Sequence, residues 1–147
     1  MGIRAITADD RAAWTPLWTG YLTFYETELP QRVFDETWRR LLDPSEPVWG
    51  AFAVDDSGTP IGLVHWLFHC TCWAVEDVCY LQDLYVSPEL RGGGYGRALI
   101  EHVADKAREA GAIRLYWNTH ETNATARRLY DAIAVRSGFI QYRKALG

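Results

Sequence analysis

A glycine-dense turn constrains the fold of this chain more than any other segment. It lies between a strand candidate at residues 78–86 and an amphipathic helix candidate at residues 94–110, and it consists of Arg91, Gly92, Gly93, Gly94, Tyr95, Gly96 and Arg97. Glycine adopts positive φ at no steric cost and lets a ligand approach the backbone closely. Free N–H groups at the start of the helix, with the helix dipole behind them, favour a phosphate or pyrophosphate. The pattern therefore predicts an anion site, to which the two arginines add charge-assisted bonds.

The other periodic segments predict a mixed α/β fold with a mostly antiparallel central sheet flanked by helices. Thr7 and Asp10 are typical of a helix start, because an acid near the first turn interacts well with the dipole. Pro30 and Pro44 bound a second helix. The remaining expected elements are strands at 3–6, 48–54, 61–68, 113–117 and 139–143, and a helix at 123–137.

Four aromatic residues recur at helical spacing near the N-terminus. Trp14, Trp18, Tyr21 and Tyr25 follow one another at intervals of four, three and four, which places their rings on one helical face. Pro16 lies within this span and either kinks the helix or marks its first turn. The rings either belong to the core or form one wall of an amine pocket through cation–π contacts.

Length and charge exclude several classes of protein. The chain has 147 residues and no linker or repeat, which predicts one domain over residues 1–147. Its formal charge is −4 and it has no basic run, so we expect no nucleic-acid partner. No apolar run approaches 18 residues and no signal peptide is evident, so we expect no membrane partner. The odd number of cysteines, three, indicates reduced thiols and a cytoplasmic location.

The turn excludes two common nucleotide motifs. It lacks the Lys-Ser/Thr pair of a Walker loop, and no glycine stands in the third position of Gly-x-Gly-x-x-Gly. The spacing that does occur is Arg91-x-x-Gly94-x-Gly96. This spacing resembles the coenzyme A pyrophosphate loop of the GCN5-related N-acetyltransferase (GNAT) superfamily.

A second segment supports the same resemblance. Residues 116–123 read Tyr-Trp-Asn-Thr-His-Glu-Thr-Asn, and Ala126, Leu129 and Tyr130 follow. This pattern is similar to the branch of the superfamily that includes fungal histone/polyamine and D-amino-acid acetyltransferases. The matching region covers residues 78–143, whereas the first half of the chain fits only in its order of elements.

The resemblance implies acetyl-CoA as co-substrate and a set of cofactor-binding residues. The backbone of the central strand is expected to pair with the pantetheine arm, with an N–H near Leu84 polarising the thioester carbonyl. Asn123 is either a helix N-cap alone or also a hydrogen-bond partner of the pantetheine. The implied positions are Leu84, Tyr85, Val86, the seven residues of the turn, Asn123, Ala126 and Tyr130.

Two residues are candidates for proton transfer. The resemblance implies that Tyr130 is the general acid, because a phenol is protonated at neutral pH and can donate to a departing thiolate. Periodicity alone would instead place Tyr130 in an apolar helical stripe. Asp83 is our first candidate for the general base, or else a structural or substrate-anchoring carboxylate. In a regular strand it shares a face with Tyr85, which a bulge would alter. His65, His120 and Glu28 are weaker candidates.

A short His-Cys cluster invites comparison with a metal site. His69, Cys70 and Cys72 lie close together and Cys79 follows. A structural zinc site needs about four ligands in suitable geometry, and this cluster is better explained as a strand end or loop. We therefore expect no metal.

The sequence favours an amine N-acetyltransferase that works by direct attack in a ternary complex. Small primary amines, polyamines or amino acids are the first expected acceptors, and a protein or peptide amine is the second. A non-catalytic acyl-CoA-binding module or sensor, or a purely structural domain, would keep the same fold. The resemblance also makes a homodimer plausible.

Overall fold

The computed structural model describes residues 2–147, and two compact units divide them at residues 117 and 118. The first unit contains a five-stranded sheet in the order β1-β2-β3-β4-β5. Its strands are β1 (Gly2–Ala5), β2 (Val48–Val54), β3 (Pro60–His69), β4 (Val78–Val86) and β5 (Leu115–Tyr116). The first four strands are antiparallel and β5 runs parallel to β4, which confirms the expected mixed α/β class.

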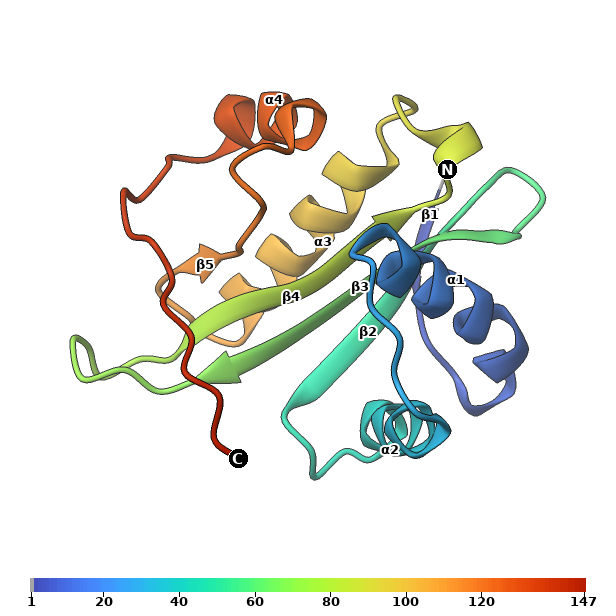
Figure 1. Ribbon diagram of the computed structural model, residues 1–147, viewed down its shortest axis with the longest axis horizontal. Coiled ribbons are helices and arrows are strands. Elements are labelled where there is room, and N and C mark those ends of the chain that lie inside the picture. Colours follow the sequence, from blue (N-terminus) through green and yellow to red (C-terminus); the bar gives the residue numbers. More distant parts are fainter. Residues whose placement is uncertain (1) are drawn as a thin grey trace. The chain divides into compact units, whose positions relative to one another are not determined.

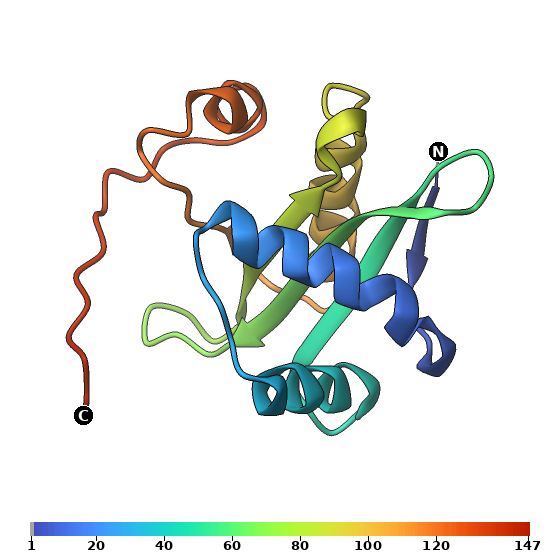
Figure 2. The ribbon, with the colours of Figure 1, turned by 45° about the vertical axis from the view of Figure 1, so that its right-hand side comes forward.

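Three helices cover the two faces of this sheet (Figures 1 and 2). They are α1 (Arg11–Phe24), α2 (Gln31–Leu42) and α3 (Tyr95–Glu109), with short 3₁₀ turns at Ala8–Asp10 and Pro88–Leu90. The helices α1 and α2 pack on one face, where Trp14, Trp38 and Leu63 belong to a single core cluster. The helix α3 packs on the other face, since a Cβ on Gly62 would lie 3.2 Å from Leu99. The sheet is therefore buried between two helical layers.

The 3₁₀ turn that leads into α1 follows the predicted polar pattern. The Asp10 carboxylate accepts hydrogen bonds from the backbone N–H and the hydroxyl of Thr7 at 2.7 and 3.0 Å. It also accepts two from the Arg4 guanidinium, at 2.8 and 2.9 Å. These bonds hold the pKa of Asp10 well below its usual range. The helix then continues through Pro16, which lies inside it rather than in its first turn.

The second unit, residues 118–147, contains one helix, α4 (Ala124–Ile133). The predicted helix at 123–137 therefore ends four residues earlier than expected. The predicted strand at 139–143 is wrong, because residues 134–147 are neither helix nor strand. A β-prone segment becomes a strand only when an edge pairs with it, and this segment pairs with none of the five described strands. Between residues 2 and 147, no helix has the length and apolar character needed to cross a membrane.

Candidate active site

A bulge in β4 sets which side chains face α1. His65 pairs with Asp83 but Trp66 pairs with Leu81, so Gln82 has no opposite residue. A single extra residue shifts the alternation of side chains along a strand. Tyr80 therefore lies on the α1 face with Asp83 and Tyr85. In a regular strand, the spacing of three between Tyr80 and Asp83 would place these two side chains on opposite faces. Asp83 and Tyr85 share a face as the sequence predicted.

The second half of β4 has a backbone edge without a strand partner. The Ser87 N–H donates to the Ile61 carbonyl at 2.8 Å, so Ser87 points toward β3. Backbone groups of successive residues in an antiparallel strand point to opposite edges, so the N–H groups of Val86 and Leu84 point away from β3. On that side β5 pairs only with Cys79 and Tyr80. The two N–H groups thus stand on a part of the edge that the described sheet leaves free.

The glycine turn leads from this edge into α3. Gly92 and Gly94 have φ values of 87° and 85°. Residues other than glycine rarely adopt such positive φ values. Gly94 is the residue before the first turn of α3, and that turn contains Tyr95, Gly96 and Arg97. A side chain on Gly92 would meet no atom within 4 Å, so the backbone there is open. The structure thus places an accessible helix N-terminus next to the free edge, as predicted.

The Arg91 side chain contacts other residues of the protein and is not directed only toward the expected anion site. Its guanidinium lies over the rings of Phe24 and Tyr85, with centroid distances of 5.4 and 5.6 Å. Its Nε donates to the Val86 carbonyl at 3.1 Å. The side chain therefore fastens the end of α1 to the end of β4 through cation–π contacts. Arg97 is exposed, and neither arginine pairs with a carboxylate among residues 2–147.

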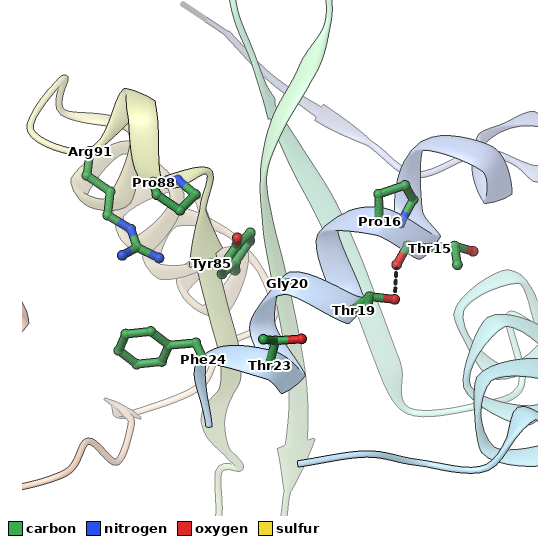
Figure 3. Close-up of a pocket in the computed structure, with 9 residues that line it drawn as sticks. All are labelled: Thr15, Pro16, Thr19, Gly20, Thr23, Phe24, Tyr85, Pro88 and Arg91. Atoms are coloured by element: carbon green, nitrogen blue, oxygen red, sulfur yellow. Dashed lines mark hydrogen bonds between the residues drawn. The ribbon is translucent and has the colours of Figure 1, made fainter. Parts of the chain in front are cut away.

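A cavity of about 570 Å³ opens between α1 and the end of β4 (Figure 3). One side is the α1 face that carries Thr15, Thr19 and Thr23, and Arg91 lines the cavity from the turn after β4. Gly20 lets α1 pack closely on Tyr85, because a Cβ there would lie 2.5 Å from the Tyr85 hydroxyl. The full lining is Thr15, Pro16, Thr19, Gly20, Thr23, Phe24, Tyr85, Pro88 and Arg91. A cavity of this size holds a small organic ligand.

Asp83 belongs to a buried polar network beneath α1. Asp83 is 8% exposed and His65 is 3% exposed. The Asp83 carboxylate lies 2.9 Å from Nδ1 of His65, and Nε2 of His65 lies 3.1 Å from the indole nitrogen of Trp14. Burial, the charge of Asp83 and a hydrogen bond to it raise the pKa of Tyr21. The candidate base is thus held by residues of α1 and β3.

The aromatic stripe of α1 divides into two parts. Trp14 and Trp18 are buried in the core, at 0% and 7% exposure. Tyr21 and Tyr25 are half-buried, with ring centroids 4.9 Å apart. Burial, the charge of Asp83 and Tyr80 raise the pKa of Tyr25. The two tryptophans are therefore core, as one of the two expectations had it, whereas the two tyrosines face the Asp83 carboxylate. The role of the stripe as a wall of an amine pocket stays a prediction.

The candidates on α4 lie in the second unit. The Asn123 side chain accepts a hydrogen bond from the Ala126 N–H at 3.4 Å, so it caps α4 as expected. Tyr130 is half-buried on the same helix. The structure therefore groups Asp83, the β4 edge and the glycine turn in one unit, whereas Asn123, Ala126 and Tyr130 form a separate group. The roles of these three residues stay predictions.

The histidine of the His-Cys cluster hydrogen-bonds to other groups of the chain. His69 Nδ1 lies 2.8 Å from the Cys70 carbonyl, and its Nε2 lies 2.8 Å from the Tyr116 hydroxyl. Since a carbonyl only accepts, Nδ1 is the donor and Nε2 the acceptor. The imidazole thus joins the end of β3 to β5. No group of three or more His, Cys, Asp or Glu side chains is arranged to hold a metal ion within the described chain.

Sequence comparison places the chain in a family. The profile of the Acetyltransferase (GNAT) family matches residues 11–134. The chain is 40% identical over 143 residues to the D-amino-acid N-acetyltransferase HPA3 of Saccharomyces cerevisiae, covering 97% of this chain and 89% of that protein. It is 32% identical over 74 residues to a thialysine N-epsilon-acetyltransferase of Caenorhabditis elegans, covering 50% of this chain and 46% of the relative.

Solved structures share the fold. A probable acetyltransferase superposes with a TM-score of 0.87 at 23% identity, covering 100% of this chain and 99% of its own. A ribosomal-protein-alanine N-acetyltransferase from Brucella melitensis gives 0.80 at 24% identity, covering 99% and 100%. The chain belongs to the acetyltransferase (GNAT) family. It is accordingly an acyltransferase of the N-acetyltransferase class, and members of this family use acetyl-CoA.

Proposed function

We propose that this protein transfers the acetyl group of acetyl-CoA to the amine of a small acceptor by direct attack in a ternary complex. The observation that carries the proposal is the free edge of β4, which runs directly into a positive-φ glycine turn and an open helix N-terminus. The free N–H groups suit an extended amide chain, and the turn suits a pyrophosphate. One continuous surface thus fits both parts of coenzyme A.

The residues that would hold the cofactor follow from this surface. Leu84 and Val86 present free backbone N–H groups, and an N–H at Leu84 suits a developing oxyanion. Tyr85 supports the edge from the α1 side by packing on Gly20. The turn from Arg91 to Arg97 receives the pyrophosphate. Asn123 and Ala126 on α4 are proposed to contact the pantetheine arm.

Two side chains are proposed to move protons. An alkylammonium must lose a proton before its nitrogen can attack. Asp83 is the buried carboxylate on the same strand as the free edge, and we assign it to receive that proton. Tyr130 is assigned to donate a proton to the leaving thiolate, which becomes the free thiol of coenzyme A. The bound cofactor supplies the acetyl thioester.

The relatives favour a small amino acid or amine as acceptor. The yeast relative is named for D-amino acids, and the nematode relative is named for thialysine. Both of these substrates are small amines that carry a carboxylate. We therefore rank an amino acid first among small primary amines and polyamines, and a protein or peptide amine second.

Calorimetric titration with CoA and acetyl-CoA tests the cofactor site. The wild-type protein should bind both, and Gly94→Glu should abolish binding, because it adds a bulky negative side chain to an anion site at positive φ. Gly111→Glu is the matched control, since Gly111 has a φ of 77° at the opposite end of α3. Absent binding to folded wild-type protein, or equal losses in the two variants, would contradict the proposal.

We also propose that the protein is a cytoplasmic homodimer. Five large apolar side chains are exposed in the second unit: Val135, Phe139, Ile140, Tyr142 and Leu146. Large apolar side chains left in water are favourable to bury, and a second copy of this chain is the proposed partner that covers them. The three cysteines are free thiols, which suits a reducing compartment.

A further inference from the structure

The cavity of about 570 Å³ beside α1 is separate from the Asp83 network (Figure 3). Successive residues of an α-helix are turned by about 100°, so the α1 residues that line the cavity are centred about 180° around the helix from the aromatic stripe. The tyrosines of that stripe face Asp83, whereas the cavity opens on the outer side of α1, toward the connection between β4 and α3. A ligand in this cavity is therefore distinct from one that contacts Asp83.

The α1 wall of the cavity is mostly apolar. The Thr15 hydroxyl donates to the Arg11 carbonyl at 2.9 Å, and the Thr19 hydroxyl donates to the Thr15 carbonyl at 2.8 Å. The protons of these two hydroxyls are thus used inside the helix. The wall also contains Pro16 and Phe24, which have apolar side chains. A ligand with an apolar body is the kind that gains free energy by leaving water for such a wall.

Arg91 supplies a positive charge at the edge of this wall. Its guanidinium lies over the rings of Phe24 and Tyr85, and its Nε donates to the Val86 carbonyl at 3.1 Å. A guanidinium has five N–H donors, and the Nε bond is the only hydrogen bond of this side chain within residues 2–147. The remaining donors form a fork that the stacking holds in place. Such a fork binds a carboxylate through two parallel hydrogen bonds.

The Arg91 fork and the start of α3 lie on different sides of the sheet. The Tyr85 side chain faces α1 and Phe24 belongs to α1, so a guanidinium above both rings lies on the α1 side. The open helix N-terminus after Gly94 belongs to α3, which packs on the opposite face. The connection between β4 and α3 therefore offers an anion two separate places, and only the one at Arg91 adjoins the cavity.

We propose that this cavity binds a small carboxylic acid with an apolar body, and that its binding opposes the binding of coenzyme A. The carboxylate pairs with the Arg91 fork and the apolar body lies along the α1 wall. Arg91 begins the turn proposed for the pyrophosphate, so the ligand places a second negative charge beside that site. Coupling between two sites is reciprocal. The binding site itself goes beyond the proposed function, and only the coupling to coenzyme A rests on it.

Binding in the absence of CoA tests the site. The probes are 2-naphthoate and its neutral counterpart 2-naphthamide, titrated by NMR. The wild-type protein should prefer the carboxylate by about tenfold or more, as expected for a charge-assisted pair. Arg91→Gln should lose that preference. Arg97→Gln is the matched control, because Arg97 is an exposed arginine of the same turn outside the cavity lining. Equal affinities for the two probes, or equal losses in the two variants, would overturn the proposed site.

A second pair of variants tests the cavity without changing Arg91. Thr19→Phe places a large side chain in the α1 wall and should weaken 2-naphthoate binding about tenfold or more, because it occupies the space of the apolar body. Ala12→Phe is the control, since Ala12 is exposed on α1 and is not part of the lining. Side chains of a helix point toward its N-terminus, so the added ring is directed away from the cavity. Unchanged affinity in Thr19→Phe would contradict the cavity as the binding site.

Calorimetric titration with CoA tests the coupling. Saturating 2-naphthoate should weaken CoA binding by about threefold at low ionic strength, where charges are least screened. Saturating 2-naphthamide should leave CoA affinity unchanged, and so should 2-naphthoate in Arg97→Gln protein only if it no longer binds. Equal CoA affinity with and without bound 2-naphthoate would overturn the coupling. Failure of the wild-type protein to bind CoA would instead contradict the proposed function, and the 2-naphthoate results would still decide the site.

Discussion

At the scale of single residues, two glycines with similar backbone conformation allow a binding role to be separated from a structural one. Gly92 and Gly111 have φ values of 87° and 77°, and a Cβ at either would meet no atom within 4 Å. We expect Gly92→Ala and Gly111→Ala each to lower the free energy of unfolding by about 1–2 kcal/mol, the cost of left-handed backbone. Only Gly92→Ala should also weaken CoA binding. Chemical denaturation and calorimetry measure the two effects, and equal binding losses would count against the turn as the cofactor site.

Tyr130 is tested by removing one oxygen atom. Tyr130→Phe should lower kcat by about 10²-fold or more, the range for loss of a general acid, with CoA affinity unchanged. Tyr142→Phe is the control, because Tyr142 is 88% exposed in the same unit. The measurement is thiol release with a saturating amine. An unchanged kcat would mean that Tyr130 belongs to the apolar stripe of its helix and that another group protonates the thiolate.

The sequence singled out individual candidate residues and missed the contacts that surround them. The glycine turn and Asp83 became candidates because their chemistry depends on residue type and local spacing. The bond between Trp14 and His65 joins residues 51 positions apart, and no local period connects them. Tyr80 was also missed, because only the bulge at Gln82 turns it toward α1. Such contacts depend on strand register, which a single sequence specifies weakly.

At the scale of elements, the Asp10 carboxylate gives the 3₁₀ turn that leads into α1 a measurable pH dependence. The Arg4 guanidinium and the hydrogen bonds from Thr7 hold the pKa of Asp10 well below its usual range. Because the pKa of Asp10 is lower in the folded protein than in the unfolded chain, its ionised carboxylate stabilises the folded state fully above about pH 4. This stabilisation is lost as the pH falls through the pKa of the folded state. Asp10→Asn should therefore cost about 1 kcal/mol of unfolding free energy from pH 5 to 8, with a smaller cost below pH 4.

The neighbouring carboxylate supplies the control for this prediction. Asp9→Asn changes an exposed residue of the same turn and should shift the unfolding free energy by less than about 0.5 kcal/mol. Urea denaturation at several pH values measures both variants. A difference between wild type and Asp10→Asn that grows as the pH falls would show that the carboxylate does not stabilise the helix start.

The elements themselves were largely predictable, because their boundaries carry local signals. Thr7 with Asp10, Pro30 and Gly111 each lie at the end of a helix in the structure. The hairpin of β2 and β3 and the strand β4 agree with the predicted ranges within one residue. The failures are the last strand and the length of α4. Residues 139–143 have strand-forming side chains, but a strand depends on an edge that the segment itself does not supply.

At the scale of the whole molecule, the three thiols report how tightly the first unit is folded. Cys70 and Cys72 are exposed and Cys79 is buried. Burial raises the pKa of Cys79 to about 11, so both access and ionisation oppose its reaction. A disulfide reagent at pH 8 should modify two thiols in the native protein and the third only after unfolding. Cys79→Ala should give two in both states, and three rapid reactions in native wild-type protein would contradict the buried position.

The proposed homodimer can be tested through the exposed apolar side chains near the C-terminus, which we expect to lie at the interface between the two copies. In a single chain, Phe139 and Ile140 are 82% and 72% exposed, so replacing them should not destabilise the isolated fold by more than about 0.5 kcal/mol. In a dimer they would lose water-exposed surface, and Phe139→Asp with Ile140→Asp would bury two charges. Sedimentation should therefore show a dimer for wild type and a monomer for the double variant, with CoA affinity retained. Val75→Asp, at a site 98% exposed in the first unit, should stay dimeric; a strictly monomeric wild-type protein would refute the dimer.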